Sequence, residues 1–244
     1  MRIYETKHEI LDDEIDVTGK LTLPKILSLS IGVSTKQSLA YGVGPEYTHA
    51  VGLGWVVLQH VITINRRPES GETMTISTHG KEFNPFLAKR DYTFVDEQGY
   101  KIIQVDSLYT MMDLKKRKMA RIPTDLVDVF DPDRVKRVPH PDKPDRIAED
   151  EAITCEQAYQ VRYSDIDSNQ HVNNARYLDW AQDPLGMDFL RTHEPKEVNI
   201  KFEHEVRWGE MIDVKIAQQA DETKHQIWYG DELSAEVSIK WTQA

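Results

Sequence analysis

Three polar side chains able to take part in chemistry stand close together in one segment, YSDIDSNQHVNNARYLDW, at positions 163–180. Asp167, Asn169 and His171 occupy alternate positions directly before an apolar series with helical spacing. The start of a helix presents unpaired N–H groups and a partial positive charge, which suit a developing oxyanion. The imidazole of His171 is the side chain here that exchanges protons most readily near neutral pH. The segment therefore indicates a proton-transfer site at the start of a helix.

Other interpretations apply to the same segment. It begins like a calcium-binding loop, but Gln170 stands where that loop requires glycine and Arg176 where it requires a bidentate glutamate. That interpretation is therefore excluded. A plain turn remains an alternative for the whole cluster, and Asn173 or Asn174 can serve as a helix N-cap.

Other catalytic schemes find no support in the sequence. It contains no G-x-S-x-G elbow, no P-loop and no dinucleotide fingerprint. Cys155 is the only cysteine, which excludes an internal disulfide and a cysteine-based zinc site. The histidines outside the cluster show no metal-ligand spacing. We therefore expect neither a metal nor a cofactor.

A second candidate for chemistry is Glu205, in the segment EVNIKFEHEV at 197–206. The segment alternates like a strand, so Glu205 should point with Asn199, away from the apolar side chains. From its position alone, a solvated strand face is the simpler explanation of this glutamate.

The elements that must position these residues occur twice along the chain in the same order. Each half has a strand, then a helix, then four strands. In the first half the ranges are 2–11, 22–41, about 55–65, 72–79, 90–95 and 100–113. In the second half they are 155–163, 172–191, 197–206, 210–219, 224–229 and 232–242. This order predicts an α+β fold in which each half wraps an antiparallel sheet around one long helix.

The two halves can be aligned with each other, which indicates a duplication. Gly71-Glu72 precedes Gly209-Glu210 by 138 positions, and Glu14-Ile15-Asp16 precedes the segment 165–167 by 151. At the second offset, the first half replaces the Asp/Asn/His set with Asp16, Thr18 and Lys20. We therefore expect one working site, in the second half, and one unit that shapes the pocket.

Between the halves lies a segment with four prolines and many charges, residues 131–150. Such a composition cannot build a core and predicts an extended linker over the surface. The predicted division is an N-terminal unit at 1–130, the linker, and a catalytic unit at 151–244. Pairing of the two units through their sheets would cover an edge that either unit alone would leave exposed.

The composition limits the partners and the location. A net charge of −11 argues against nucleic acid, and no run of 18 apolar residues is present to span a membrane. The N-terminus shows neither an apolar signal core nor an Arg/Ser-rich transit segment, so we expect a cytoplasmic protein. One basic cluster is either a solvated strand end or an anion-docking site. It consists of Lys115, Lys116, Arg117, Lys118 and Arg121.

With the string DIDSNQHVNNARYLDW in view, the chain resembles the acyl-[acyl-carrier-protein] thioesterases of plastids and bacteria. The order D-x-N-x-H-V-N-N before an aromatic-rich helix is characteristic of that family's second hot-dog unit. The resemblance extends to GWVVLQHVITINRRPESGETMTIST, AKRDY and DLKKRKMARIP in the first half. It implies a double hot-dog fold and hydrolysis of the thioester between a fatty acyl chain and acyl carrier protein (ACP). The family's catalytic set maps onto Asp167, Asn169, His171 and Glu205.

One departure from the family bears on the mechanism. Many plant members have a cysteine directly after the glutamate, and this chain has Val206. The nucleophile is then either water activated by Glu205 or His171, or the carboxylate of Asp167. ACP is acidic, so docking on this acidic protein would use the basic cluster.

The remaining expectations concern the substrate and the assembly. Substrate contacts are predicted for Asn173, Asn174, Leu27, Ile31 and Leu39. An acyl-CoA thioesterase, a hot-dog dehydratase and a non-catalytic acyl-binding module are the alternative functions. The oligomeric state stays open between a monomer and a homodimer, because pairing of the units within one chain could already satisfy the fold.

Overall fold

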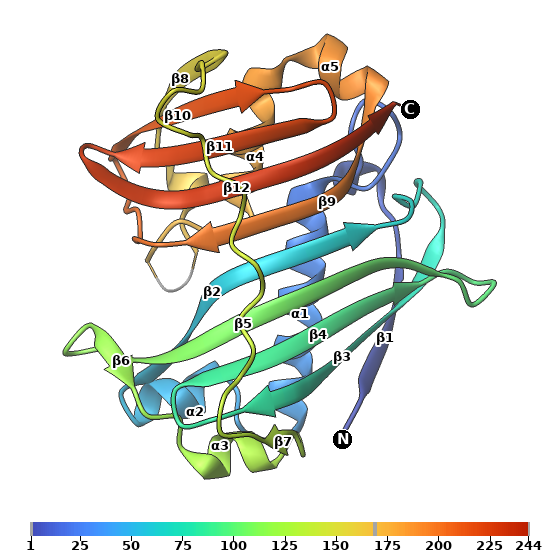
Figure 1. The fold of residues 1–244 in the computed structure, drawn as a ribbon. Helices are drawn as coiled ribbons and strands as arrows, with labels where there is room; N and C mark the ends of the chain where they lie inside the picture. The colour runs from blue at the N-terminus through green and yellow to red at the C-terminus, as the bar shows by residue number, and fades with distance from the viewer. Residues whose placement is uncertain (1, 168–169, 244) are drawn as a thin grey trace.

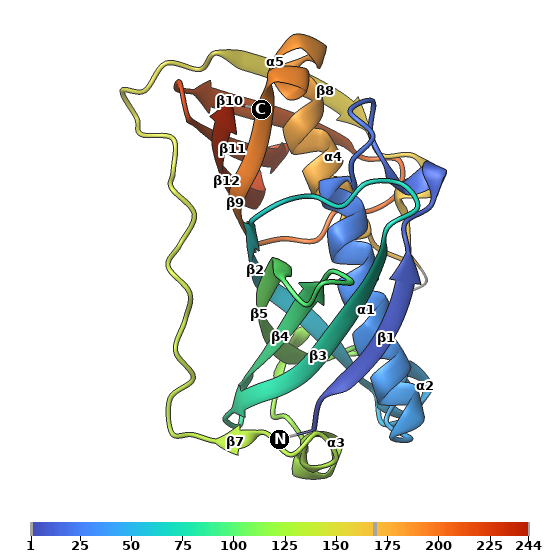
Figure 2. The same cartoon turned by 90° about the vertical axis from the view of Figure 1, so that its right-hand side faces the viewer.

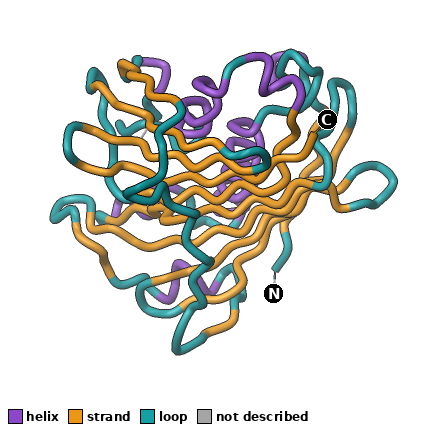
Figure 3. The backbone as a smooth tube through the Cα atoms, turned by 45° about the horizontal axis from the view of Figure 1, so that its top comes forward, coloured by secondary structure: helices purple, strands orange, loops and turns teal. Residues whose placement is uncertain are grey.

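Twelve strands join in one sheet within residues 2–167 and 170–243, the part of the chain that this computed structural model describes (Figure 1). Along the sheet the order is β1 (Tyr4–Glu9), β3 (Thr73–Phe83), β4 (Leu87–Val95), β5 (Lys101–Asp113), β2 (Leu53–Ile64), β9 (His193–Phe202), β12 (Glu232–Gln243), β11 (Glu222–Tyr229), β10 (Met211–Gln218) and β8 (Cys155–Gln160). The short strands β6 (Lys118–Ala120) and β7 (Asp133–Arg134) pair with β5 and β3. Figure 3 shows the strands as one continuous layer.

The first long helix, α1 (Leu23–Ala40), agrees with the range predicted from periodicity. Thr22 caps it by accepting a hydrogen bond from the Lys25 N–H, and Pro24 stands in the first turn, where no N–H is needed. Ile26 and Leu27 are fully buried against the sheet. Two short helices, α2 (Pro45–Ala50) and α3 (Thr124–Asp128), complete the N-terminal half.

The single helix predicted at 172–191 is wrong. That stretch instead contains α4 (Arg176–Gln182), a 3₁₀ turn η3 (Asp183–Leu185) and α5 (Met187–Thr192). Pro184 lacks the N–H that would continue the helix, and Gly186 has φ of +79°, outside the helical region. The buried residues of α4 pack into the same core as α1, so the second unit wraps a short helix.

The two units meet through β2 and β9, which pair antiparallel at the centre of the sheet. In this pairing Val61 lies opposite Asn199, which is its own counterpart at the offset of 138. A residue paired with its counterpart places a local twofold axis at that point. The predicted pairing of the units through their sheets is therefore confirmed.

Main-chain hydrogen bonds confirm the duplication. A short β-bridge joins Ile15 to Leu21 in the first half and Ile166 to Val172 in the second. The corresponding N–H groups, at positions 16 and 167, each donate at 2.9 Å to the carbonyl four residues on. Before these loops stand two equivalent 3₁₀ turns, η1 (Asp12–Glu14) and η2 (Tyr163–Asp165).

The linker crosses the face of the sheet opposite to α1 and α4, as Figure 2 shows. The carbonyl of Asp142 accepts hydrogen bonds from the Gln59 amide at 2.7 Å and the Asn199 amide at 2.9 Å. Arg146 pairs with the buried Glu236 at 2.8 Å. The predicted extended path is thus anchored at the seam between the units. Because both units share one sheet, the predicted limits at 130 and 151 stay predictions.

Candidate active site

His171 and Glu205, predicted from separate segments, lie side by side. The Nε2 of His171 is 3.1 Å from Oε2 of Glu205. The main chain fixes this proximity, because the N–H of Val172 donates to the carbonyl of Val206 at 3.1 Å. The same Nε2 atom also lies 3.5 Å from Nη2 of Arg117, so a carboxylate that only accepts and a guanidinium that only donates both face it. The pair can therefore exchange protons with a bound molecule.

The prediction that Glu205 lies within a strand is wrong. β9 ends at Phe202, and the next two N–H groups, of Glu203 and His204, both donate to the carbonyl of Ser234. Two consecutive donors on one acceptor bend the chain away from the sheet. Glu205 therefore stands on a loop beyond the strand, where it can turn towards His171.

A third residue, Arg117, was predicted for docking but contacts the pair itself. Its guanidinium forms an ion pair with Oε2 of Glu205, and its Nη2 lies 3.5 Å from Nε2 of His171. Arg117 comes from the hairpin between β5 and β6. This hairpin and the loop after β9 both lie at the left end of the strands in Figure 1. The N-terminal unit therefore contributes a charge to the site.

Burial and the neighbouring cations favour the neutral form of His171. Burial lowers the pKa of this histidine, and the positive charges of Arg117 and Arg207 lower it further, while Asp167 opposes them. With a pKa below the ordinary value of 6.5, the ring is mainly neutral at pH 7. A neutral imidazole can take up a proton, as a general base must.

The rest of the Asp/Asn/His segment is held by turns. The N–H of Asp167 donates to the carbonyl of His171 at 2.9 Å, and Asn169 lies outside the described residues. The side chain of Asn173 accepts the N–H of Ala175 at 3.0 Å, so it organises a turn before α4. Because α4 begins at Arg176, the expectation of a helix start directly at the histidine is wrong.

The predicted acyl-chain residues do not share one environment. Leu27 is fully buried in the core and Ile31 is partly buried, but Leu39 is 60% exposed. Leu39 lies in the last turn of α1, which extends beyond the core. The substrate contacts of these three residues stay predictions.

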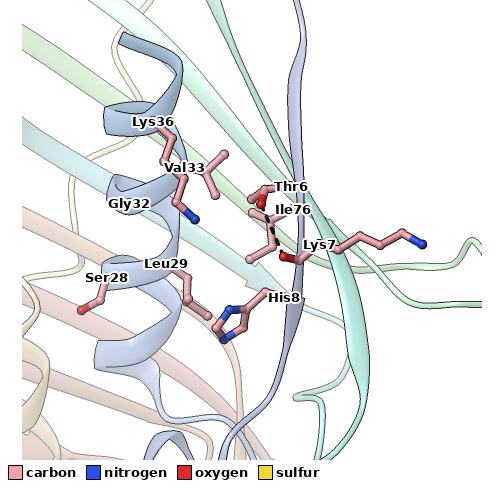
Figure 4. A pocket seen from close by; sticks show the side chains of 9 residues that line it. All are labelled: Thr6, Lys7, His8, Ser28, Leu29, Gly32, Val33, Lys36 and Ile76. Carbon is pink, nitrogen blue, oxygen red and sulfur yellow. Dashed lines mark hydrogen bonds between the residues drawn. The ribbon is translucent and has the colours of Figure 1, made fainter. Parts of the chain in front are cut away.

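A small pocket lies between β1 and α1, lined in part by His8, Leu29 and Val33 (Figure 4). Its volume is about 80 Å³, below the few hundred Å³ of an ordinary ligand pocket. None of the predicted catalytic residues lines it. This pocket is therefore separate from the candidate site.

The first unit carries a structural ion-pair network where the second has its candidate site. At the offset of 138, Arg67 is the counterpart of Glu205, and its side chain is only 4% exposed. It pairs with Asp16 and, at 2.9 Å, with Glu194, which Lys20 also contacts at 2.8 Å. These charges satisfy one another, and Lys20 stands where the second unit has His171. The presence of one working site stays a prediction.

Within the described chain, no cluster of three His, Cys, Asp or Glu side chains could hold a metal ion. The helices of the same residues are too short or too polar to cross a membrane.

One sheet is shared by two repeated units, and the second unit has His171 and Glu205 in contact where the first has Lys20 and Arg67 at the counterpart positions. This arrangement defines a tandem protein with a candidate active site in its second unit. Comparison with models of protein families identifies the family. The acyl-ACP thioesterase N-terminal domain matches residues 1–130 and the C-terminal domain matches 148–243, so the chain belongs to the acyl-ACP thioesterase family. The resemblance recognised in the sequence is confirmed.

Solved structures agree with this membership. A protein from Lactobacillus plantarum, whose assignment as an oleoyl thioesterase is provisional, is 34% identical, with a TM-score of 0.94 over 99% of this chain and 96% of that one. The 12:0-ACP thioesterase of Umbellularia californica superposes with a TM-score of 0.87 at 17% identity, over 99% and 98% of the two chains. The predicted double hot-dog fold is thus confirmed.

Curated relatives are more distant. A chloroplastic acyl-[acyl-carrier-protein] hydrolase of Cuphea viscosissima is 28% identical over 68% of this chain and 41% of its own length. The chloroplastic oleoyl-ACP thioesterase of Coriandrum sativum is 24% identical over 90% of this chain and 63% of its own length. The chain therefore spans less than two thirds of these relatives.

Proposed function

We propose that this protein hydrolyses fatty acyl-ACP thioesters to free fatty acid and holo-ACP. The observation that carries the proposal is the contact between His171 and Glu205, in the one unit that has a histidine at this position. Membership of the acyl-ACP thioesterase family supports the same reaction class. Release of the free fatty acid would divert acyl chains out of fatty acid synthesis.

The proposed reaction uses His171 and Glu205 to activate water. Glu205 lies beside the ring, and the neutral imidazole accepts a proton as the water oxygen attacks the thioester carbonyl carbon. The carbon–sulfur bond then breaks, and the imidazolium returns the proton to the leaving thiolate. Asn169 is proposed to donate to the developing oxyanion, and Asp167 to orient the groups or to attack the carbonyl directly.

A thiol nucleophile plays no part in this scheme. Val206 stands where many plant members have cysteine, and its side chain is fully buried. The choice between water and the Asp167 carboxylate is open to experiment. If the reaction runs in ¹⁸O-water with a single turnover, direct water attack places the label in the fatty acid and not in the protein.

The carrier-protein partner is proposed to dock on the hairpin between β5 and β6. Lys115, Lys116 and Lys118 of this hairpin are exposed, as is Arg121 beyond it. These cations stand next to the candidate site, because Arg117 of the same hairpin contacts Glu205. An acidic carrier would therefore approach with its acyl thioester close to His171.

The test is a substrate panel of acyl-ACP thioesters of varied chain length, run beside the matching acyl-CoA thioesters, with free fatty acid as the readout. The proposal expects release from acyl-ACP with a higher kcat/KM than from acyl-CoA. A preference for acyl-CoA would indicate the alternative thioesterase, and tight binding without release would indicate a binding module. Size-exclusion chromatography and cell fractionation would test the homodimer and the cytoplasmic location, both of which stay predictions.

A further inference from the structure

In each unit, the loop after the central strand is held by an opposite charge from the other unit. After β2 of the N-terminal unit, Arg67 pairs with Glu194 of the C-terminal unit. After β9 of the C-terminal unit, Glu205 pairs with Arg117 of the N-terminal unit. The two positions are counterparts at the offset of 138, and their charges are reversed. Both units therefore form an ion pair with the other unit at this position, but the cation and the anion are exchanged.

The two ion pairs differ in exposure. The side chains of Arg67 and Glu194 are 4% and 15% exposed, which suits a purely structural contact. Those of Arg117 and Glu205 are 38% and 32% exposed, and they lie beside His171, which is 22% exposed. The second pair is thus open to solvent and to a bound molecule at the point where the histidine stands.

The hairpin presents Arg117 in a defined conformation. Arg117 has φ of +55°, in the left-handed region, which costs a non-glycine residue about 1–2 kcal/mol. Its N–H donates to the Asp113 carbonyl at 2.8 Å. The Asp113 carboxylate accepts the N–H groups of Lys115 at 3.0 Å and Lys116 at 2.8 Å. The turn therefore brings Arg117 to Glu205, although its side chain, like those of the neighbouring lysines, stays exposed.

We propose that Arg117 is a positioning residue that holds the Glu205 carboxylate against His171 for the reaction. The inference rests on the proposed thioesterase function and adds a role for the N-terminal unit in it. A guanidinium is planar and always charged, so it can fix a carboxylate in one orientation. Without it, Glu205 would be free to turn on its loop and would hold the imidazole less often in the productive orientation.

The charge of Arg117 also acts on the proton equilibrium of the site. The groups that face His171 are Arg117 from the hairpin, Glu205 and Arg207 from the loop after β9, and Asp167 from its own loop. After burial, Arg117 is the strongest cause of the lowered pKa of His171. Removal of this cation should raise that pKa, so the acid limb of the pH–rate profile should move to higher pH.

The experiment compares the Arg117→Ala, Arg117→Lys and Arg66→Ala variants with the unmodified protein. Arg66 is a matched control, because it forms an exposed ion pair with Glu72 in which the side chains are 41% and 33% exposed. Each protein is assayed from about pH 5 to about pH 9, which spans the ordinary histidine pKa. The substrates are acyl-ACP and an acyl-N-acetylcysteamine thioester, which lacks the carrier.

The proposal expects Arg117→Ala to lower kcat about 10- to 100-fold on both substrates, the size of effect that misplacing a reacting group produces. KM should change little, and the acid limb should move upward. Arg117→Lys should recover part of kcat and part of the shift, and Arg66→Ala should change neither. If Arg117→Ala does not fold, as judged by circular dichroism, Arg117→Gln takes its place.

Other outcomes would overturn the inference. A rise in KM for acyl-ACP alone, with an unchanged pH profile, would make Arg117 a docking residue only. A higher kcat in Arg117→Ala would make the contact inhibitory. If the unmodified protein hydrolyses neither substrate, it is the proposed thioesterase function that fails, and the two failures are thereby distinguished.

Discussion

Removal of one partner of the buried ion pair between Arg67 and Glu194 should destabilise the contact of the two units strongly. Burial would raise the pKa of Glu194, but hydrogen bonds from Arg67 and Lys20 outweigh it and lower the pKa. The Glu194→Ala substitution would leave the guanidinium of Arg67, 4% exposed, with Asp16 as its remaining carboxylate. An uncompensated buried charge is strongly unfavourable, so the network should not tolerate this change well.

The expected loss is about 3 kcal/mol, the lower end of the range for breaking a buried pair, because Asp16 still compensates part of the charge. For a chain of this size, that corresponds to a fall in Tm of about 6–12 °C. The free energy of unfolding would be measured by urea denaturation at pH 7. A double change, Arg67→Met with Glu194→Leu, should restore much of the loss, because it removes both charges.

The matched control is Glu197→Ala, since Glu197 forms a surface ion pair with Lys240 at 3.0 Å in which both side chains are about half exposed. A surface pair contributes at most about 1 kcal/mol, so this variant should lose little stability. If Glu194→Ala lost no more than Glu197→Ala, the ion pair between Arg67 and Glu194 would not hold the units together as argued.

Three further outcomes follow from other parts of the structure. His60 and His225 are fully buried and have pKa values lowered to about 3, so each should make unfolding easier as the pH falls from 6.5 towards 3, by up to about 1.4 kcal/mol per pH unit. Replacement of both by glutamine should flatten the pH dependence of the urea midpoint, and an unchanged slope would contradict this origin. Gln170 has φ of +67°, so Gln170→Gly should raise the free energy of unfolding by about 1 kcal/mol, whereas a loss of stability would show that its side chain makes a needed contact. The double change of Lys115 and Lys116 to Glu should raise KM for acyl-ACP strongly at about 0.01 M salt and little at about 1 M, and equal effects at both would remove the docking proposal.

The residues that repeat along the chain were the most predictable part of the fold. The offset of 138 between Gly71 and Gly209 marks turns that have φ of +81° in both halves. Only a residue that tolerates positive φ fits there, so the sequence carries the constraint directly. The succession of strands and helix along each half and the position of α1 follow from similarly local patterns.

The errors have identifiable physical causes. The apolar spacing through Leu185 predicts one helix, but Pro184 lacks a helical N–H and Gly186 has a positive φ, so the helix breaks there. Glu205 leaves the strand because two N–H groups share the carbonyl of Ser234, a long-range contact that alternation does not encode.

The contact of Arg117 with Glu205 could not be predicted from a basic cluster. It requires the hairpin between β5 and β6 to approach the loop after β9, and these segments lie in different units. Within this hairpin, Arg117 has a left-handed backbone conformation, and it is the cation of the cluster that contacts Glu205. Tertiary packing determines which charge of the cluster contacts Glu205.

The central claim is that His171 and Glu205 form one proton-transfer unit, and its most direct test is single-turnover hydrolysis of acyl-ACP by His171→Ala, Glu205→Gln and the double variant. The rate of each single variant should fall about 10²–10⁴-fold, with the double variant no slower than the worse single one. Folding would be confirmed by circular dichroism in each case. Near-normal rates in either single variant, or losses that multiply in the double variant, would contradict the claim.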